Sequence, residues 1–381
     1  MEVRAVTTRL ELDALAPEWN DLLQTSSADT IFLTWEYISA WLDAVAPRAE
    51  LYVLTVRNWS GELVGIAPFY RRQILLRRVL TYRCFCILGN HASPAEYLDL
   101  IVRRDHEQPV LNALGTALTC SGDWDCIWIP RVAGWTGAPE RLGRLVRAAG
   151  LHVWRRDVPF SAIELPSALD QYLQLLSSKT RYQVRRGAKQ LNESGEVTFE
   201  HCRSLKQLPG FIDDLERLHQ KHWESVDEPG GFRRNPSFRA FVETICLRAI
   251  DKGWVGFTRV RVNDTCVAVQ FGFTYHGTFS SIQEGFDPDF KKVTYGIGNV
   301  LRCRTIQECI DAGLTRYDFL GGESWHKQRW GAQVRQGFDL FIHRRTIKTL
   351  PLRARPVWPT GRHMSWHADG SAYQPEKRLI L

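Results

Sequence analysis

The sequence predicts a mixed α/β protein of two domains, in which mainly antiparallel strands carry helices packed against them. Three observations lead to this prediction. The chain has 381 residues, too many for one ordinary domain and suitable for two. Hydrophobic residues make up 44% of it and charged residues 24%, the proportions of a globular protein rather than a disordered one. The order hairpin, strand, helix, strand occurs twice along the chain.

The first half begins with a hairpin. Two apolar segments, 51–56 and 63–70, have the composition of strands, and Asn58-Trp-Ser-Gly61 supplies the turn between them. A strand, a helix, a strand and a second helix are then expected at residues 97–102, 110–118, 126–129 and 139–149. Gly150 follows the second helix, where a helix stop is expected.

The second half repeats this order. The turn Asn263-Asp264 joins strands expected at 254–262 and 266–274. A strand, a helix and a strand follow, at residues 278–284, 296–312 and 315–320. Helices are also expected between the halves, at residues 169–191 and 211–223. Because no repeat of residues accompanies the repeated order, the duplication rests on element order alone.

The net charge of +7 is concentrated at the carboxyl terminus. From Arg344 to Leu381, eight Lys or Arg residues stand against two acidic residues, which leaves a net +1 for the rest of the chain. A nearly neutral body does not resemble a dedicated nucleic-acid binder. The prolines of this segment predict an irregular basic tail over 344–381. A soluble terminus is the simpler interpretation of the tail, and contact with an anionic lipid face or a partner is the alternative.

Composition also bears on location and on metals. The nine scattered cysteines favour reduced thiols and a cytoplasmic protein. Residues 1–23 mix acidic and apolar residues, unlike a signal peptide, and the apolar runs are far shorter than the roughly 20 residues that cross a bilayer. His219 and His222 lie one helical turn apart without an identifiable third ligand, so a helix surface is favoured and no metal is expected.

A basic cluster lies inside the fold, from Lys179 to Lys189. Arg181, Arg185 and Lys189 are spaced four residues apart and share one face of the expected helix. Such a face could hold phosphates or the acidic part of a substrate, which makes Arg181 and Arg185 candidate substrate-binding residues, and a solvated helix surface is the alternative. Trp325 is a candidate for lining a substrate cleft, with a place in the core as the alternative.

The stretch from Glu284 to Arg304 is the most informative for chemistry. A strand ends, an acidic loop follows, and Gly296 and Gly298 stand at the start of a helix. Glycines there let a ligand approach the backbone, and the amides of a first helical turn suit a pyrophosphate. We expect Arg302 on the outward face of this helix. The chain has no Walker phosphate loop, no third glycine of a dinucleotide fingerprint and no nucleophile elbow.

Asp318 lies downstream, within a short strand of apolar residues. A carboxylate among apolar neighbours must be paired, exposed at an edge or shifted in pKa. A hydrogen bond that ties the strand to the next loop is the structural alternative to a catalytic role.

These segments together resemble a known family. The runs Tyr295-Gly-Ile-Gly298 and Tyr317-Asp-Phe-Leu-Gly-Gly322, followed by His326-Lys327, are similar to the CelD/BcsL group of acyltransferase-like proteins. That group belongs to the GNAT superfamily and is similar to the FemAB aminoacyltransferases. The resemblance implies two tandem GNAT-like domains, at 1–165 and 166–343, followed by the tail from 344. The second domain would hold the acyl donor.

The resemblance also implies a donor and a reaction. Backbone amides would bind the pyrophosphate of acyl-CoA, at Tyr295, Gly296, Ile297, Gly298 and Asn299. Only the Gly296-x-Gly298 part of the standard GNAT phosphate loop is kept. The implied reaction moves an acyl group to an amine or hydroxyl of a sugar or small amino compound, in cell-envelope or exopolysaccharide synthesis.

Acyl transfer needs a base, a group that stabilises the carbonyl oxygen as it becomes anionic, and two substrates held in line. Glu284 and Asp318 are the candidate bases, and His326 is the alternative because its ordinary pKa is near neutrality. Lys327 could stabilise developing charge or hold an acidic substrate. Two other functions stay open. One is a FemAB-like aminoacyltransferase whose basic helix contacts tRNA or a phosphorylated lipid precursor. The other is a non-catalytic scaffold of a polysaccharide synthase complex.

Overall fold

The computed structural model describes residues 1–76, 80–354 and 364–366. By contacts, the chain forms two compact units. The first consists mainly of residues 1–159 together with the described residues from 336 onward, and the second mainly of residues 160–335. The chain passes between the units within β7 (His152–Glu164) and again within β13 (Gln333–His343). The domain boundaries expected at 165 and 343 stay a prediction.

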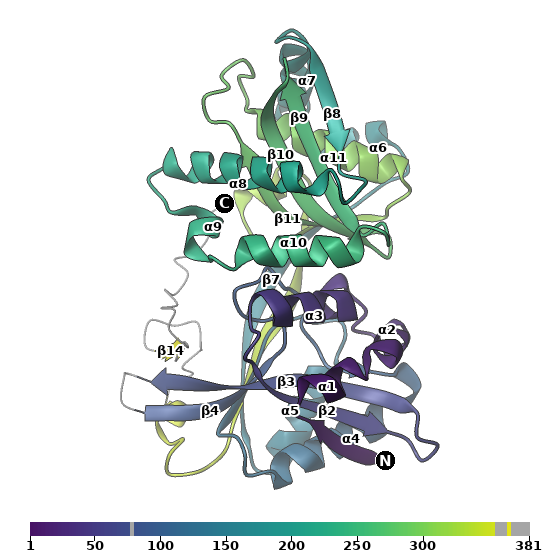
Figure 1. Cartoon of the computed structure of the whole chain (residues 1–381), viewed down its shortest axis with the longest axis vertical. Helices are drawn as coiled ribbons and strands as arrows, with labels where there is room; N and C mark the ends of the chain where they lie inside the picture. The colour runs from purple at the N-terminus through teal and green to yellow at the C-terminus, as the bar shows by residue number, and fades with distance from the viewer. Residues whose placement is uncertain (77–79, 355–363, 367–381) are drawn as a thin grey trace. The chain divides into compact units, whose positions relative to one another are not determined.

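The first unit is a sheet of order β1-β2-β3-β4-β6-β13, with the short strands β5 and β14 paired to β3 (Figure 1). Its neighbours run antiparallel except β4 and β6, which are parallel. The strands besides β13 are β1 (Glu2–Val6), β2 (Glu50–Arg57), β3 (Leu63–Leu76), β4 (Leu80–Ile87), β5 (Ile101–Val102), β6 (Cys126–Val132) and β14 (Met364–Trp366). The helices are α1 (Arg9–Asp13), α2 (Ala16–Thr25), α3 (Trp35–Ala44), α4 (Glu107–Cys120), α5 (Ala138–Ala148) and α13 (Pro351–Ala354), with 3-10 turns at Ile31–Leu33 and Arg104–His106.

One expected strand of this unit is wrong. Of the segment predicted at 97–102, only β5 is extended along a neighbour, because Tyr97 has a left-handed φ of 56° that interrupts a strand. The third strand of the unit is instead β4, which the sequence analysis did not identify. Its exposed residues Leu80 and Arg83 lie in its first half, and a continuous buried run from Cys84 to Ile87 forms its second.

The second unit is a sheet of order β7-β12-β11-β10-β9-β8, to which β7 contributes its last residues. All neighbours are antiparallel except β11 and β12, which are parallel. Its strands are completed by β8 (Val197–His201), β9 (Val255–Val262), β10 (Thr265–Tyr275), β11 (Thr278–Phe286) and β12 (Arg316–Gly321). Its helices are α6 (Leu169–Leu175), α7 (Ser178–Asn192), α8 (Leu208–Glu224), α9 (Gly230–Arg234), α10 (Phe238–Ala249), α11 (Ile297–Asp311) and α12 (Trp325–Gln328).

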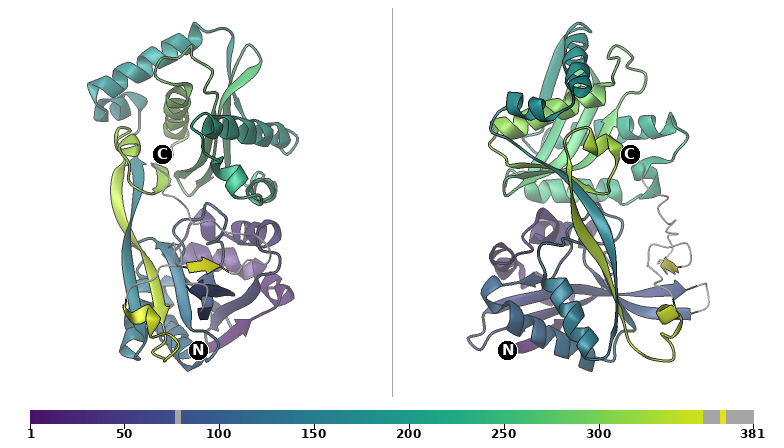
Figure 2. Two further views of the ribbon diagram at one scale, coloured as in Figure 1. Left: turned by 90° about the vertical axis from the view of Figure 1, so that its left-hand side faces the viewer. Right: turned by 180° about the vertical axis from the view of Figure 1, so that it is seen from behind.

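Helices cover both faces of this second sheet. Helices α8 and α10 lie on one face, and α6, α7 and α11 lie on the other, as the front and rear views show (Figures 1 and 2). The α11 side is held by apolar side chains from helices and strands together, among them Val184, Ile306 and Tyr317, all of them buried. A second cluster, which includes Leu191, Val260 and Ile297, continues this core under α7 and the start of α11. Burial of such side chains is the main stabilising contribution in a fold of this size.

The expected order of elements is therefore present in both units. It is β2, β3, β4, α4, β6 in the first and β9, β10, β11, α11, β12 in the second, and in each the third and last strands form the parallel pair. The predicted mixed α/β class with mainly antiparallel strands is confirmed. Among the described helices, none combines the length and the apolar character needed to cross a bilayer.

The start of the basic tail is ordered. Arg344 donates hydrogen bonds to the carbonyl oxygens of Trp124 (3.0 Å) and Leu118 (3.1 Å), and Lys348 pairs with Asp125 at 2.6 Å. Residues 351–354 form the short helix α13. Residues 344–350 form bends and turns whose cations meet carbonyl and carboxylate oxygens of the first unit. The irregular tail expected from residue 344 stays a prediction. Apart from β14, the rest of the tail lies outside the described residues.

The close approach of α8 to β11 gives a test of this packing. A Cβ atom at Gly285 would lie 2.7 Å from the backbone nitrogen of His219, a distance that forces the helix to shift. We expect Gly285→Ala to lower the free energy of unfolding by roughly 1–3 kcal/mol, measured by urea denaturation. The matched control is Gly210→Ala, whose Cβ meets only the end of the Arg259 side chain at 3.7 Å. Equal stability of the two variants would contradict the packing described.

Candidate active site

The site forms where two parallel strands separate. Strands β11 and β12 pair only over Thr278–Ser280 and Arg316–Asp318. Beyond these residues β11 continues alongside β10, while Gly321 of β12 pairs with Phe160 of β7. Side chains from α11 and α12 approach both strands in this divergence, as the contacts below show. In a parallel pair of this kind, polar groups near the ends of the strands converge on one place.

Arg302 of α11 links the two strands. Its guanidinium donates to both carboxylate oxygens of Glu284, with 3.1 Å from Nε to Oε1 and a shorter contact from Nη2 to Oε2. It also lies 5.9 Å from the ring centre of Phe319 on β12. Only 6% of Arg302 is exposed, and burial alone would lower the pKa of its guanidinium. The Glu284 carboxylate outweighs this effect, so the pKa of Arg302 is raised. The expectation that Arg302 faces outward is wrong, because this ion pair draws the side chain inward.

Two further polar side chains complete this pair. Gln270 of β10, directly opposite Glu284 in the sheet, donates from Nε2 to Oε1 of Glu284 at 2.9 Å. The same amide contacts the hydroxyl of Tyr317 on β12. Burial and the Glu284 carboxylate raise the pKa of Tyr317, so its hydroxyl keeps its proton at neutral pH. The result is a buried polar network around a carboxylate that is itself one-fifth exposed.

His326 joins this network as a neutral imidazole. Nη1 of Arg302 lies 3.0 Å from Nε2 of His326, and since a guanidinium only donates, Nε2 accepts and Nδ1 carries the proton. Burial and the nearby Arg302 lower the pKa of His326 to about 4. Nε2 of His326, the alternative base, is therefore already engaged by Arg302.

Asp318 and Lys327 instead hold the turn after β12. Oδ1 of Asp318 accepts the backbone N–H of Leu320 at 2.7 Å, and 3% of Asp318 is exposed. The ammonium of Lys327 contacts carbonyl oxygens at 3.0, 3.4, 2.6 and 3.2 Å, on residues 319–322 in order. Leu320 has a φ of 62°, a strained value for its type that these contacts stabilise. This arrangement supports structural roles for both residues.

The start of α11 has the features expected of an anion site. Gly296 precedes the helix with a φ of 85°, and a Cβ atom added there would meet nothing within 4 Å. No described side chain caps this helix end, so the first N–H groups of α11, those of Ile297 and Gly298, have no side-chain partner. Ile297 itself is buried. The backbone N–H of Asn299 donates to the carbonyl oxygen of Gly296 at 3.3 Å. Tyr295 lies beside α7, with its ring 6.3 Å from that of Tyr182.

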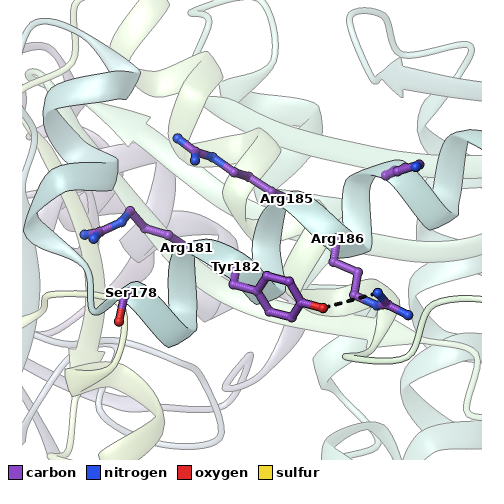
Figure 3. Close-up of a pocket in the computed structure, with 6 residues that line it drawn as sticks. Ser178, Arg181, Tyr182, Arg185 and Arg186 are labelled. Atoms are coloured by element: carbon purple, nitrogen blue, oxygen red, sulfur yellow. Dashed lines mark hydrogen bonds between the residues drawn. The ribbon is translucent and has the colours of Figure 1, made fainter.

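The basic helix lies next to this site. A shallow hollow of about 400 Å³ follows the outward face of α7, lined by Ser178, Arg181, Tyr182, Arg185, Arg186 and Lys189 (Figure 3). Arg181 donates to the carbonyl oxygen of Leu176, the residue that follows α6, and so hydrogen-bonds the carboxyl end of that helix. This contact supports a structural role for Arg181. Arg185 is exposed, and 72% of Trp325 is exposed. The structure therefore brings Glu284 and His326 together through Arg302, and leaves Arg185 and Trp325 at the surface.

The paired histidines of α8 do not form a metal site. Nε2 of His219 accepts the N–H of Gly231 at 2.9 Å, and Nδ1 donates to the carbonyl oxygen of Glu284 at 3.1 Å. Burial lowers the pKa of His219 to about 4. His222 packs on Phe286 at 4.1 Å between ring centres. Within the described ranges, no group of three or more His, Cys, Asp or Glu could hold a metal ion.

Sequence reasoning missed the residues that organise the site, Arg302, Gln270 and Tyr317. Gln270 lies in an apolar strand and is 1% exposed, so an unexplained polar residue in that strand was the available signal. Arg302 had no such signal, because charged residues on helices are ordinarily solvated.

Comparisons with known proteins agree with this architecture. Residues 178–328 match the family model described as an acetyltransferase (GNAT) domain. The solved structure of FemX superposes with a TM-score of 0.60 at 11% identity, covering 89% of this chain and 97% of that one. A conserved protein of unknown function from Bacteroides thetaiotaomicron gives a TM-score of 0.53 at 10% identity, covering 90% of this chain and 100% of the other. At such identities the likeness shows the fold. Comparison with curated proteins gives no match.

The buried ion pair gives a second prediction. Arg302→Met leaves the Glu284 carboxylate without its cation, and we expect it to destabilise the second unit by roughly 3 kcal/mol in urea unfolding. Adding Glu284→Gln to this variant removes the uncompensated charge and should restore part of the loss. A double variant that is no more stable than Arg302→Met alone would show that the pair does not account for the effect.

The neutral imidazoles predict acid sensitivity. In the unfolded chain histidine binds a proton near pH 6.5, whereas His219 and His326 do so only near pH 4 in the fold. Between these values the unfolded state holds more protons, so stability falls with falling pH, by about 1.4 kcal/mol per pH unit for each imidazole. His326→Gln should reduce this slope, measured by urea unfolding between pH 7 and pH 4, while the exposed His276→Gln should leave it unchanged. Identical slopes in all three proteins would refute the assignment.

Proposed function

Because residues 178–328 match the model of the GNAT acetyltransferase domain and the chain has the fold of FemX, we propose that this protein transfers an acyl group from acyl-CoA to an amine or hydroxyl. The observation that carries the proposal is the uncapped start of α11 at the divergence of β11 and β12. An acyl-CoA binds there through its diphosphate, and its thioester lies toward Glu284.

The residues present fit a diphosphate. The first N–H groups of α11, which no described side chain caps, and the positive end of the helix favour an anion, and the open space at Gly296 lets phosphate oxygens reach the backbone. A Cβ atom at Gly298 would lie 3.2 Å from Phe286, so that position is already close to a side chain. The diphosphate is therefore assigned to the side of Gly296 and Ile297.

Glu284 is the base in this proposal. It lies next to the divergence with one-fifth of its side chain exposed, whereas Asp318 is buried and engaged by the backbone of its own turn. Glu284 takes the proton of the incoming amine or hydroxyl as that group attacks the acyl carbonyl, and the thiol leaves. Arg302 and Gln270 are positioning residues that fix both carboxylate oxygens.

The acceptor class rests on the resemblance to the CelD/BcsL group. We propose a sugar or small amino compound of cell-envelope or exopolysaccharide synthesis. Lys327 was expected to stabilise the developing oxyanion, but its ammonium is surrounded by four carbonyl oxygens. A main-chain amide of β11 next to the divergence suits that task better, because β11 has no partner on the β12 side beyond Ser280 among the described strands.

Binding of CoA tests the proposal directly. Ile297 is the first residue of α11, where proline is tolerated, so Ile297→Pro removes one amide donor and keeps the helix. We expect it to weaken acetyl-CoA binding about 10- to 100-fold, the usual contribution of a hydrogen bond to a charged group. The matched control is Ile297→Ala, which loses the same buried side chain but retains the N–H. Affinities are measured by calorimetry and by thermal stabilisation.

Other outcomes would identify the alternatives. If acetyl-CoA and longer acyl-CoA leave the melting temperature unchanged but an aminoacyl-tRNA raises it, the protein is a FemAB-like aminoacyltransferase. If none of these binds, the non-catalytic scaffold stands. Equal CoA binding by the proline and alanine variants would remove α11 from the donor site.

A further inference from the structure

Helix α7 carries a concentration of positive charge. Five of its fifteen residues are Lys or Arg and none is acidic. The chain before the carboxyl-terminal tail has a net charge of only about +1, so other regions balance this excess. Arg185, Arg186 and Lys189 are exposed, and the nearest acid to Lys189 is Glu193 at 3.8 Å, with both side chains more than half exposed. The helix thus presents a compact cationic face to solvent.

Large apolar side chains stand beside this charge. Three side chains of the region remain in solvent: 66% of Leu175, 54% of Tyr182 and 72% of Trp325 is exposed. Arg181 places Leu175 at the start of α7, because it donates to the carbonyl oxygen of the adjoining residue. Arg329 places Trp325 next to α7, since it contacts the Trp325 ring at 5.4 Å and donates to Gln183 at 2.8 Å. Apolar and cationic groups therefore share one surface.

The backbone beneath this surface is fixed. A Cβ atom at Gly187 would lie 3.0 Å from Val300, so α7 packs closely on α11. Gln190 both donates to the hydroxyl of Thr294 (2.9 Å) and accepts its N–H (3.0 Å), which ties α7 to the loop before α11. The buried side of α7 holds it in the core, and the outward residues make no contribution there. Rigid presentation lowers the entropic cost of docking onto a flat partner.

From these observations we infer that the outward surface of α7, together with Leu175 and Trp325, docks onto an anionic lipid bilayer. We call it the α7 surface, formed by Lys179, Tyr182, Arg185, Arg186 and Lys189 with those two apolar residues. Basic side chains gain electrostatic energy at an anionic leaflet, and Trp, Tyr and Leu enter the interfacial region. The shallow hollow along α7 has room for phosphate headgroups (Figure 3).

The apolar residues favour a bilayer over a nucleic acid. A base can stack on Tyr182 or Trp325, but Leu175 offers no planar face and is better accommodated among lipid chains. Leu175 is the last residue of helix α6, so its side chain projects from the end of this helix rather than from a groove. The inference does not depend on the proposed acyl donor, because the α11 site and the α7 surface use different residues.

Vesicle binding tests this inference. The full chain is sedimented with vesicles of phosphatidylcholine alone or with about 30% phosphatidylglycerol, at ionic strengths of about 0.1 and 0.5 M. We expect binding to the anionic vesicles only, and its loss at the higher salt. Arg185→Gln, Arg186→Gln and Lys189→Gln together should weaken partitioning roughly 100-fold. Leu175→Ser with Trp325→Ser should weaken it roughly tenfold without changing the salt dependence.

A matched control removes the same charge elsewhere. Arg48, Arg203 and Lys206 are exposed and lie outside α6, α7 and α12, so their combined change to Gln should leave vesicle binding unaltered. Melting temperatures verify that each variant is folded. The inference is overturned if the unmodified protein ignores phosphatidylglycerol vesicles, or if the two triple variants bind them equally. Preferential binding of tRNA in competition with the vesicles would also overturn it and make the α7 surface a nucleic-acid interface.

Discussion

The early end of the pairing between β11 and β12 positions the polar side chains of the candidate site in the second unit. Two parallel strands that part after three residues expose polar backbone and leave a wedge that something must fill. Arg302 fills it, and because a buried guanidinium requires a counter-charge, Glu284 is held at the same place. Gln270 then donates to the same carboxylate, and its amide also contacts the hydroxyl of Tyr317. A carboxylate fixed in this way is available to a substrate only through its exposed fifth.

The sequence could predict the elements whose pattern is local. The hairpin β9–β10, the strand β11 and the helix α11 have apolar periodicity and turn residues, and all are present within a few residues of expectation. It could not predict that β13 pairs with β6 in the first unit, because that pairing joins residues more than two hundred apart in the chain. Nor did it reveal β4, whose buried run from Cys84 to Ile87 follows the exposed Arg83 without alternation.

The candidate site divides in the same way. Gly296 and Gly298 were visible in the sequence because glycine before a helix has a physical reason to be there. The sequence could not distinguish structural from solvent-exposed Lys and Arg residues, because it does not show whether the charged group of the side chain has hydrogen-bond partners in the fold. In the structure, Lys327 and Arg181 close chain turns through carbonyl oxygens, whereas Arg185 remains in water. That distinction depends on contacts made by the folded backbone, which no spacing rule encodes.

The neutral state of His326 follows from the same wedge. Its Nε2 accepts from Arg302, so a proton there would set two cations side by side in a buried space. Protonation of the imidazole would therefore oppose the guanidinium that pairs with Glu284. The charge of His326 therefore bears on the cation that holds Glu284, the base of the proposed reaction. Acid conditions should thus disturb this corner before they disturb the apolar core around α11.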